Sequence, residues 1–183
     1  MKPALQRVAV FGLPGTGKTT FARRLAALLE VPHYELDAFL FKPGGVAPLE
    51  EFRAEVAKLT DADAWIVDGN YSKLRDVTWW RAEVVVWLDY GLPVIVWRVA
   101  RRDLRRILAR ERLWDGQRMT WRRAFFGRRS VLGNAVRKWL QNRGKYRVYV
   151  ERERPVGVAV LRFRSPRAAQ RWLAEHEHAA VRT

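Results

Sequence analysis

Cysteine is absent from this 183-residue chain. The absence excludes a disulfide framework and any metal site built from thiolates, and it is typical of a protein from a reducing compartment. Histidine is scarce as well, with residues at positions 33, 176 and 178 only. Their spacing does not form a metal-binding set, and we interpret His33, which follows Pro32, as a loop residue.

A long uninterrupted hydrophobic run is also missing. The most apolar window, residues 84–97, is broken by Asp89, Gly91 and Pro93, and it is shorter than the roughly 20 apolar residues that a membrane-spanning helix needs. The first residues, MKPALQRVAVFG, contain no apolar segment followed by a small-residue cleavage site. We therefore expect a cytoplasmic protein that does not act on a membrane.

Acidic residues are scarce in one part of the chain. Residues 98–154 contain 19 Lys and Arg against five Asp and Glu, and so hold +14 of the formal charge of +16. Such a field attracts polyanions, among them nucleotides, nucleic acids and acidic membranes. The basic surface is therefore one region and not the whole protein.

Apolar runs alternate with helical patterns along the chain. The runs are continuous, as expected for strands of a parallel sheet that is covered on both faces. We predict one α/β domain over residues 1–183, with a five-stranded parallel sheet in the order 2-3-1-4-5. The predicted strands are residues 7–12, 34–37, 64–68, 83–89 and 156–163, and the predicted helices are 17–30, one from 48, 94–109 and one from 165 to about 177.

The segment GLPGTGKTT fits the phosphate-binding pattern G-x-x-x-x-G-K-[ST], with a predicted strand before it and a predicted helix after it. Glycines permit a tight loop whose backbone N–H groups point at phosphate oxygens, and the helix adds the positive end of its dipole. Lys18 is expected at the β- and γ-phosphates, and the Thr19 hydroxyl at Mg²⁺. No later Asn-Lys-x-Asp supports recognition of guanine, so we expect ATP. The predicted nucleotide-binding residues of the loop are Gly12, Pro14, Gly15, Thr16, Gly17, Lys18, Thr19 and Thr20.

Three predicted strands end in an aspartate, and ligands of an open parallel sheet lie beyond the carboxyl ends of its strands. Asp68 suits the magnesium shell together with Thr19, and a turn contact is the alternative. Asp37 lies where the molecule that accepts a phosphoryl group is expected, and a carboxylate there orients the attacking hydroxyl of that molecule or takes its proton. The alternative for Asp37 is a helix cap. Asp89 precedes a turn, which favours a structural role.

These motifs together resemble the P-loop kinases built on the nucleoside-monophosphate kinase core. The likeness extends to small bacterial adenylate-kinase-like proteins known as DNA topology modulation proteins. Their pattern joins the phosphate-binding loop to a Leu-Asp, a Trp-Ile-x-Asp-Gly-Asn-Tyr segment, a second Leu-Asp and an Arg-rich lid. Here these are Leu36-Asp37, residues 65–71, Leu88-Asp89 and the stretch from Arg98. The resemblance implies a three-layer P-loop NTPase fold with a basic helical lid around residues 98–150.

The resemblance also bears on the acceptor. Adenylate kinases have Asp-Gly-Phe-Pro-Arg where residues 68–72 read Asp-Gly-Asn-Tyr-Ser, so the Pro-Arg is lost and Lys73 or Arg75 is the nearest replacement. Adenylate kinases also hold the monophosphate with an early Arg, whereas residues 37–42 contain Asp37 and no Arg. The pattern favours phosphoryl transfer from ATP to a hydroxyl of a small molecule. A nucleoside-monophosphate kinase is the alternative.

Arg98 and Arg102 match the Arg-x-x-x-Arg with which adenylate kinases begin their lid. The resemblance implies that Arg98 stacks on adenine and that Arg102 contacts phosphates. Residues four apart share one helix face, and a guanidinium stays charged beside a transferring phosphoryl group. With Lys18 and Asp37, these two arginines are the predicted catalytic residues.

Two interpretations of the basic region stay open. Its aromatic residues either form the inner face of a lid that closes over ATP and acceptor, or they form a track for a polynucleotide. Apolar residues recur there at steps of three to four, which favours the lid. A nucleic-acid-binding regulator switched by ATP, with its nucleic acid on residues 98–154, is therefore a second alternative function. The aromatic residues of the basic region are Trp114, Trp121, Phe125, Phe126, Trp139 and Tyr146.

Nothing in the sequence sets the oligomeric state.

Overall fold

The structure, a computed structural model, describes residues 5–42, 45–110, 119–126 and 130–180. Five parallel strands form its main sheet in the order β2-β5-β1-β6-β7. When these five strands are numbered along the chain, this is the predicted order 2-3-1-4-5. The strands are β1 (Arg7–Gly12), β2 (His33–Glu35), β5 (Trp65–Asp68), β6 (Val84–Leu88) and β7 (Ala159–Phe163).

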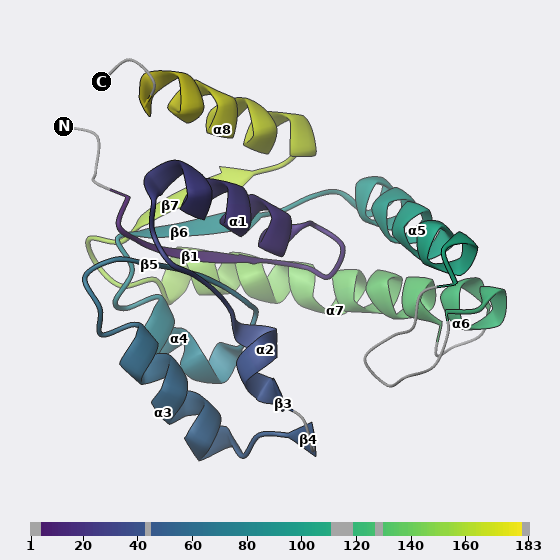
Figure 1. Cartoon of the computed structure of the whole chain (residues 1–183), viewed down its shortest axis with the longest axis horizontal. Helices are drawn as coiled ribbons and strands as arrows, with labels where there is room; N and C mark the ends of the chain where they lie inside the picture. Colours follow the sequence, from purple (N-terminus) through teal and green to yellow (C-terminus); the bar gives the residue numbers. More distant parts are fainter. Residues whose placement is uncertain (1–4, 43–44, 111–118, 127–129, 181–183) are drawn as a thin grey trace.

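Helices cover both faces of this sheet, which confirms the predicted three-layer α/β fold. The covering helices are α1 (Lys18–Leu29), α3 (Leu49–Leu59), α4 (Arg75–Thr78), α7 (Val131–Arg152) and α8 (Pro166–Ala180). Figure 1 shows α1 and α8 on one side of the sheet and α3, α4 and α7 on the other.

Each face of the sheet has its own hydrophobic core, because successive side chains of a strand point in opposite directions. Val8 and Val10 of β1 pack with α1 and α8, whereas Ala9 and Phe11 pack with α3 and α4. All five residues of β6 are buried. Burial on both faces explains why the strands are apolar without interruption.

The carboxyl ends of the strands meet at one edge of the sheet. Gly12 of β1 pairs with Leu88 of β6, and Glu35 of β2 pairs with Asp68 of β5. The loop after Gly12 therefore emerges beside Asp68 and beside Asp89, which follows β6.

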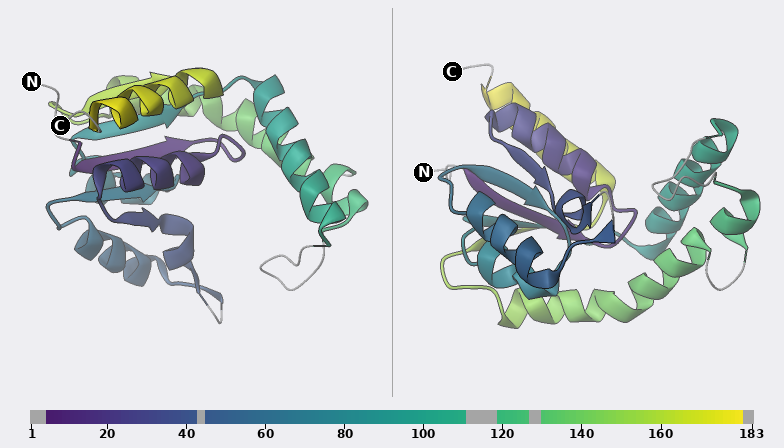
Figure 2. Two further views of the ribbon diagram at one scale, coloured as in Figure 1. Left: turned by 45° about the horizontal axis from the view of Figure 1, so that its top comes forward. Right: turned by 60° about the horizontal axis from the view of Figure 1, so that its bottom comes forward.

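Beyond that edge, α5 (Leu92–Leu108), α6 (Trp121–Phe125) and the first turns of α7 pack against one another. Figure 2 shows this arm projecting from the sheet, while the rest of α7 runs back along it. Tyr146 and Tyr149 of α7 pack into the core on the α3 and α4 side. The lid predicted at residues 98–150 therefore includes a segment that belongs to the core. Trp114 lies outside the described residues.

The second and the last predicted strands differ most from the observed ones. The second strand ends at Glu35, and Asp37 lies in the short helix α2 (Leu36–Leu40) instead. The last strand begins at Ala159, because a turn in which Val158 N donates to Pro155 O at 3.3 Å precedes it. A small antiparallel pair, β3 (Phe41–Lys42) and β4 (Gly45–Val46), was not predicted.

No helix in the described ranges is long and apolar enough to cross a membrane.

Candidate functional site

The predicted phosphate-binding loop forms a tight turn between β1 and α1. The backbone N–H and the hydroxyl of Thr16 both donate to Leu13 O, at 3.2 and 2.8 Å. Gly15 and Gly17 have φ angles of 86° and 83°, which favour glycine. A Cβ added at Gly17 would lie 2.5 Å from the Arg98 guanidinium. The loop therefore has the tight, glycine-dependent turn that the sequence predicts, with Arg98 against it.

Thr19 and Asp68 come together as a pair of oxygen ligands. The Thr19 hydroxyl donates to Asp68 Oδ1 at 3.0 Å, and Asp68 is buried at the end of β5. Hydroxyl and carboxylate oxygens suit Mg²⁺, which usually keeps one or two protein ligands beside phosphates and water. The predicted magnesium residues thus fit the ion.

His33 is a member of this site that sequence reasoning missed. Its Nε2 lies 2.7 Å from Asp68 Oδ2, and the residue begins strand β2 and is not in a loop. The contact joins two neighbouring strands whose register the sequence does not reveal. The one usable signal was a polar residue at the start of a strand that pairs with the strand carrying Asp68.

Lys18 lies among charged groups from several elements. Loss of hydration lowers its pKa, and the carboxylates of Asp68 and Asp37 act against that shift. The ammonium of Lys138, from α7, lowers the pKa further. The structure thus brings Lys18, Asp37 and Asp68 together as the sequence predicts, and it adds Lys138, which the sequence did not single out.

Asp37 is exposed on α2, where it accepts a hydrogen bond from the Tyr71 hydroxyl. Burial, followed by this hydrogen bond, raises the pKa of Tyr71 above its ordinary value. Tyr71 therefore keeps its proton at neutral pH and acts as a donor. Its ring packs edge-on against Phe52, with the ring centroids 5.0 Å apart.

A cavity of about 250 Å³ lies next to this cluster, between β1, β5, α4 and α7. Gly69 lines the cavity, and a Cβ added there would lie 2.8 Å from the Leu36 side chain. Glycine after Asp68 thus lets α2 approach the sheet edge. The polar residues of the cavity wall are Asn70, Tyr71, Ser72, Arg75, Thr78, Asn142, Lys145, Tyr146 and Tyr149.

Arg98 and Arg102 are placed differently. Arg98 lines a hollow of about 50 Å³ with Gly17 and Thr20 on one side and Gln170 of α8 on the other. Arg102 instead directs its Nε to Asp103 Oδ1 at 2.9 Å. The structure thus brings Arg98 to the phosphate-binding loop, and it turns Arg102 toward its own helix.

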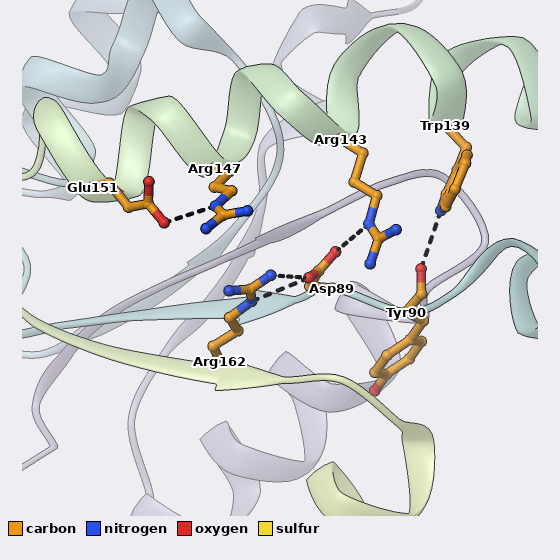
Figure 3. Close-up of polar contacts among 7 residues, drawn as sticks. All are labelled: Asp89, Tyr90, Trp139, Arg143, Arg147, Glu151 and Arg162. Carbon is orange, nitrogen blue, oxygen red and sulfur yellow. Dashed lines mark hydrogen bonds and ion pairs between the residues drawn. The ribbon is translucent and has the colours of Figure 1, made fainter.

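Asp89 anchors the strand ends to α7, as Figure 3 shows. It is buried and accepts from Arg162 of β7, at 2.5 and 3.1 Å, and from Arg143 of α7, at 3.3 Å. Trp139 Nε1 donates to Tyr90 O at 3.2 Å beside this group. These contacts give Asp89 the structural role that the sequence favours.

The fold occurs in solved kinase structures. The chain is similar to a shikimate kinase from Acinetobacter baumannii in complex with shikimate, with a TM-score of 0.57, 20% identity and coverage of 97% of this chain and 93% of that one. It is also similar to a shikimate kinase from Bacteroides thetaiotaomicron, with a TM-score of 0.54, 15% identity and coverage of 95% and 97%. The P-loop kinase fold follows from this likeness.

Other comparisons are negative. No protein-family model matches the chain, and no curated protein matches it. The predicted likeness to DNA topology modulation proteins is not supported, and the likeness that the solved structures support is one of fold, to P-loop kinases.

Proposed function

We propose that the protein transfers the terminal phosphoryl group of ATP, with Mg²⁺, to a hydroxyl group of a small molecule. The observation that carries the proposal is the contact of Thr19 with Asp68 at the carboxyl edge of the sheet, with Asp37 held by Tyr71 at the wall of a separate cavity. The P-loop kinase fold supports it.

The phosphate-binding loop and Lys18 hold the phosphates of ATP in this proposal. Gly15 and Gly17 permit the tight turn of the loop and let Val99 and Arg98 of α5 approach it, and the α1 N-terminus directs its dipole at the anion. Thr19 and Asp68 hold Mg²⁺, which neutralises charge on the transferring group when it is bound. Arg98 lies at the loop and covers the nucleotide, and Arg102 reaches the phosphates only after its contact with Asp103 breaks.

Asp37 orients the acceptor hydroxyl. Its carboxylate is exposed, lies near Lys18, and is fixed by Tyr71. A carboxylate in that place takes the hydroxyl proton or holds the oxygen in line with the phosphorus. Positioning and electrostatics then supply the catalysis.

Production of ADP from ATP, measured against a panel of sugars, hydroxy acids, nucleosides and nucleoside monophosphates, tests the proposal. A hydroxyl compound that accelerates ADP release and gains the phosphoryl group supports it. Lys18→Ala is expected to reduce that turnover by at least ~10²-fold, while Lys58→Ala, at an exposed position of α3, leaves it unchanged.

Two other outcomes would replace the proposal. Acceleration by monophosphates alone identifies a nucleoside-monophosphate kinase. Slow hydrolysis without any acceptor, together with nucleic-acid affinity that falls steeply with salt, identifies a regulator switched by ATP.

A further inference from the structure

One face of α7 lines the cavity. Asn142, Lys145 and Tyr149 all line the cavity, and their spacing of three and four residues places them on one helix face. Tyr146 of the same helix accepts a hydrogen bond from Asn70, which lies two residues after Asp68. A molecule in the cavity therefore contacts the helix that meets the loop after Asp68.

The cavity wall is cationic. Arg75 and Lys145 line it, and no Asp or Glu of the described residues does. Among the described contacts, Lys145 has no ion-pair partner and is exposed. A charged side chain that has no ion-pair partner at the wall of a cavity is suited to a ligand group of opposite charge, and Lys145 is such a side chain.

Arg75 of α4 is held in place beside Tyr149 of α7. Its Nη1 donates to Glu153 at 2.6 Å, its Nε donates to Ser72 O at 3.3 Å, and its guanidinium lies 3.6 Å from the centre of the Tyr149 ring. The described contacts leave Nη2 without a hydrogen-bond acceptor. A fixed guanidinium with a free donor is suited to a carboxylate or a phosphate oxygen.

The remaining walls restrict the body of the ligand. Phe11 and Trp79 form an apolar floor, with their ring centroids 4.6 Å apart, and the Tyr146 ring meets Phe11 edge-on. The volume of about 250 Å³ lies below the usual ligand pocket of roughly 300–1,000 Å³. The site thus suits a compact molecule with one apolar or flat face.

We infer, on the basis of the proposed function, that the acceptor is a compact hydroxyl compound with an anionic group, and that Lys145 and Arg75 bind this group while its hydroxyl lies toward Asp37. A carboxylate and a phosphate share the required chemistry. Charge on the ligand is thus the specificity determinant of the cavity.

Binding of matched probes tests the inference without any turnover. The probes are 3-hydroxybenzoate with its neutral counterpart 3-hydroxybenzamide, and glycerol 3-phosphate with glycerol. Titrations are followed by the indole N–H resonance of Trp79, assigned with Trp79→Phe, in the presence of ADP and Mg²⁺ to occupy the phosphate-binding loop. The first pair reports on carboxylates and the second on phosphates.

We expect the anion of at least one pair to bind ~10-fold more tightly than its neutral partner, as one charge-assisted hydrogen bond provides. Lys145→Gln and Arg75→Gln abolish this preference and leave binding of the neutral probe unchanged. Arg147→Gln, which removes the same charge from an exposed position of α7, leaves the preference intact.

Equal affinities within both pairs overturn the inference, and so does a preference that survives in Lys145→Gln. A preference lost in Lys18→Ala but not in Lys145→Gln overturns it as well, because the anion then occupies the phosphate-binding loop. Failure of ADP to bind contradicts the proposed function instead. The probe titrations measure the affinity of the cavity for each probe whether or not ADP binds.

Discussion

At the scale of single residues, the Tyr71 hydroxyl holds the residue proposed to orient the acceptor. It donates to Asp37, and burial keeps it protonated. Tyr71→Phe removes only this donor, so Asp37 loses its fixed orientation. We expect kcat to fall by ~10-fold, the effect of about one hydrogen bond to a charged group, while KM for ATP is unchanged.

Steady-state kinetics check this expectation. Tyr34→Phe is the matched control, since Tyr34 is a half-buried tyrosine of β2 whose ring packs against Phe39. Equal kcat values for Tyr71→Phe and the unaltered protein would show that Asp37 needs no such support.

His33 offers a second test at this scale. Its imidazole contacts the Asp68 carboxylate, and groups that hold a metal ligand commonly change metal affinity by ~10–100-fold when they are lost. His33→Gln is therefore expected to raise the Mg²⁺ concentration needed for half-maximal activity by ~10-fold and to leave saturated activity nearly unchanged. A magnesium titration of ATP turnover measures this.

The control for His33 is a histidine of α8 that does not contact Asp68. His176 of α8 contacts the backbone oxygen of Trp172 at 2.8 Å, and His176→Gln removes an imidazole without touching Asp68. An unaltered magnesium requirement in His33→Gln would assign the contact with Asp68 to folding alone.

At the scale of elements, Asp89 joins β6, β7 and α7. Its loss leaves two guanidiniums beside a buried position, although both are partly exposed, with side-chain exposures of 29% for Arg162 and 45% for Arg143. Breaking a fully buried pair costs about 3–5 kcal/mol, and exposure of the partners reduces this. We expect Asp89→Asn to lower the free energy of unfolding by ~2 kcal/mol, as measured with urea.

The two partners of Asp89 are expected to differ. Arg162→Gln costs more stability than Arg143→Gln, because Arg162 makes two shorter contacts and is less exposed. Arg147→Gln, which breaks an exposed pair with Glu151, changes the free energy of unfolding by less than about 0.5 kcal/mol. Equal effects of all three would mean that Asp89 does not anchor α7.

The elements also show what the sequence predicts and what it does not. The glycine-rich turn between β1 and α1 depends on a local pattern and lies where it was predicted, and the strand order, which is a long-range property, is also as predicted. Asp37 was placed at a strand end, yet it lies in α2, because apolar residues on both sides of it look alike in a short strand and a short helix. Short segments thus limit the prediction of local structure.

Long-range contacts were beyond the sequence for a different reason. His33 contacts a carboxylate 35 positions away, and Arg162 contacts one 73 positions away. Lys138 stood among many arginines and lysines that a helical pattern assigns to solvent. Side chains of this kind are identified only when the register of strands and the direction of α7 are known.

At the scale of the whole molecule, the charge is concentrated in the region that forms the arm and α7. Residues 98–154 carry +14 of the +16, and Figure 2 shows the arm beyond the edge of the sheet, while the rest of α7 runs back along the sheet. A field of one sign raises the local concentration of an anionic substrate. ATP binding is therefore expected to depend on this field as well as on direct contacts.

Salt distinguishes long-range attraction of ATP by the basic region from direct contacts with ATP. It weakens the long-range attraction, since the screening length falls from about 10 Å at 0.1 M to about 3 Å at 1 M. Raising sodium chloride from 50 mM to 500 mM is expected to raise KM for ATP by ~10-fold and to leave kcat nearly constant, because chemistry occurs among groups in contact. Initial rates over an ATP series at each salt concentration provide both values. A KM for ATP that does not change with salt would mean that the basic region binds another anion. Titration with single-stranded DNA at the same salt concentrations would then show whether that anion is a polynucleotide.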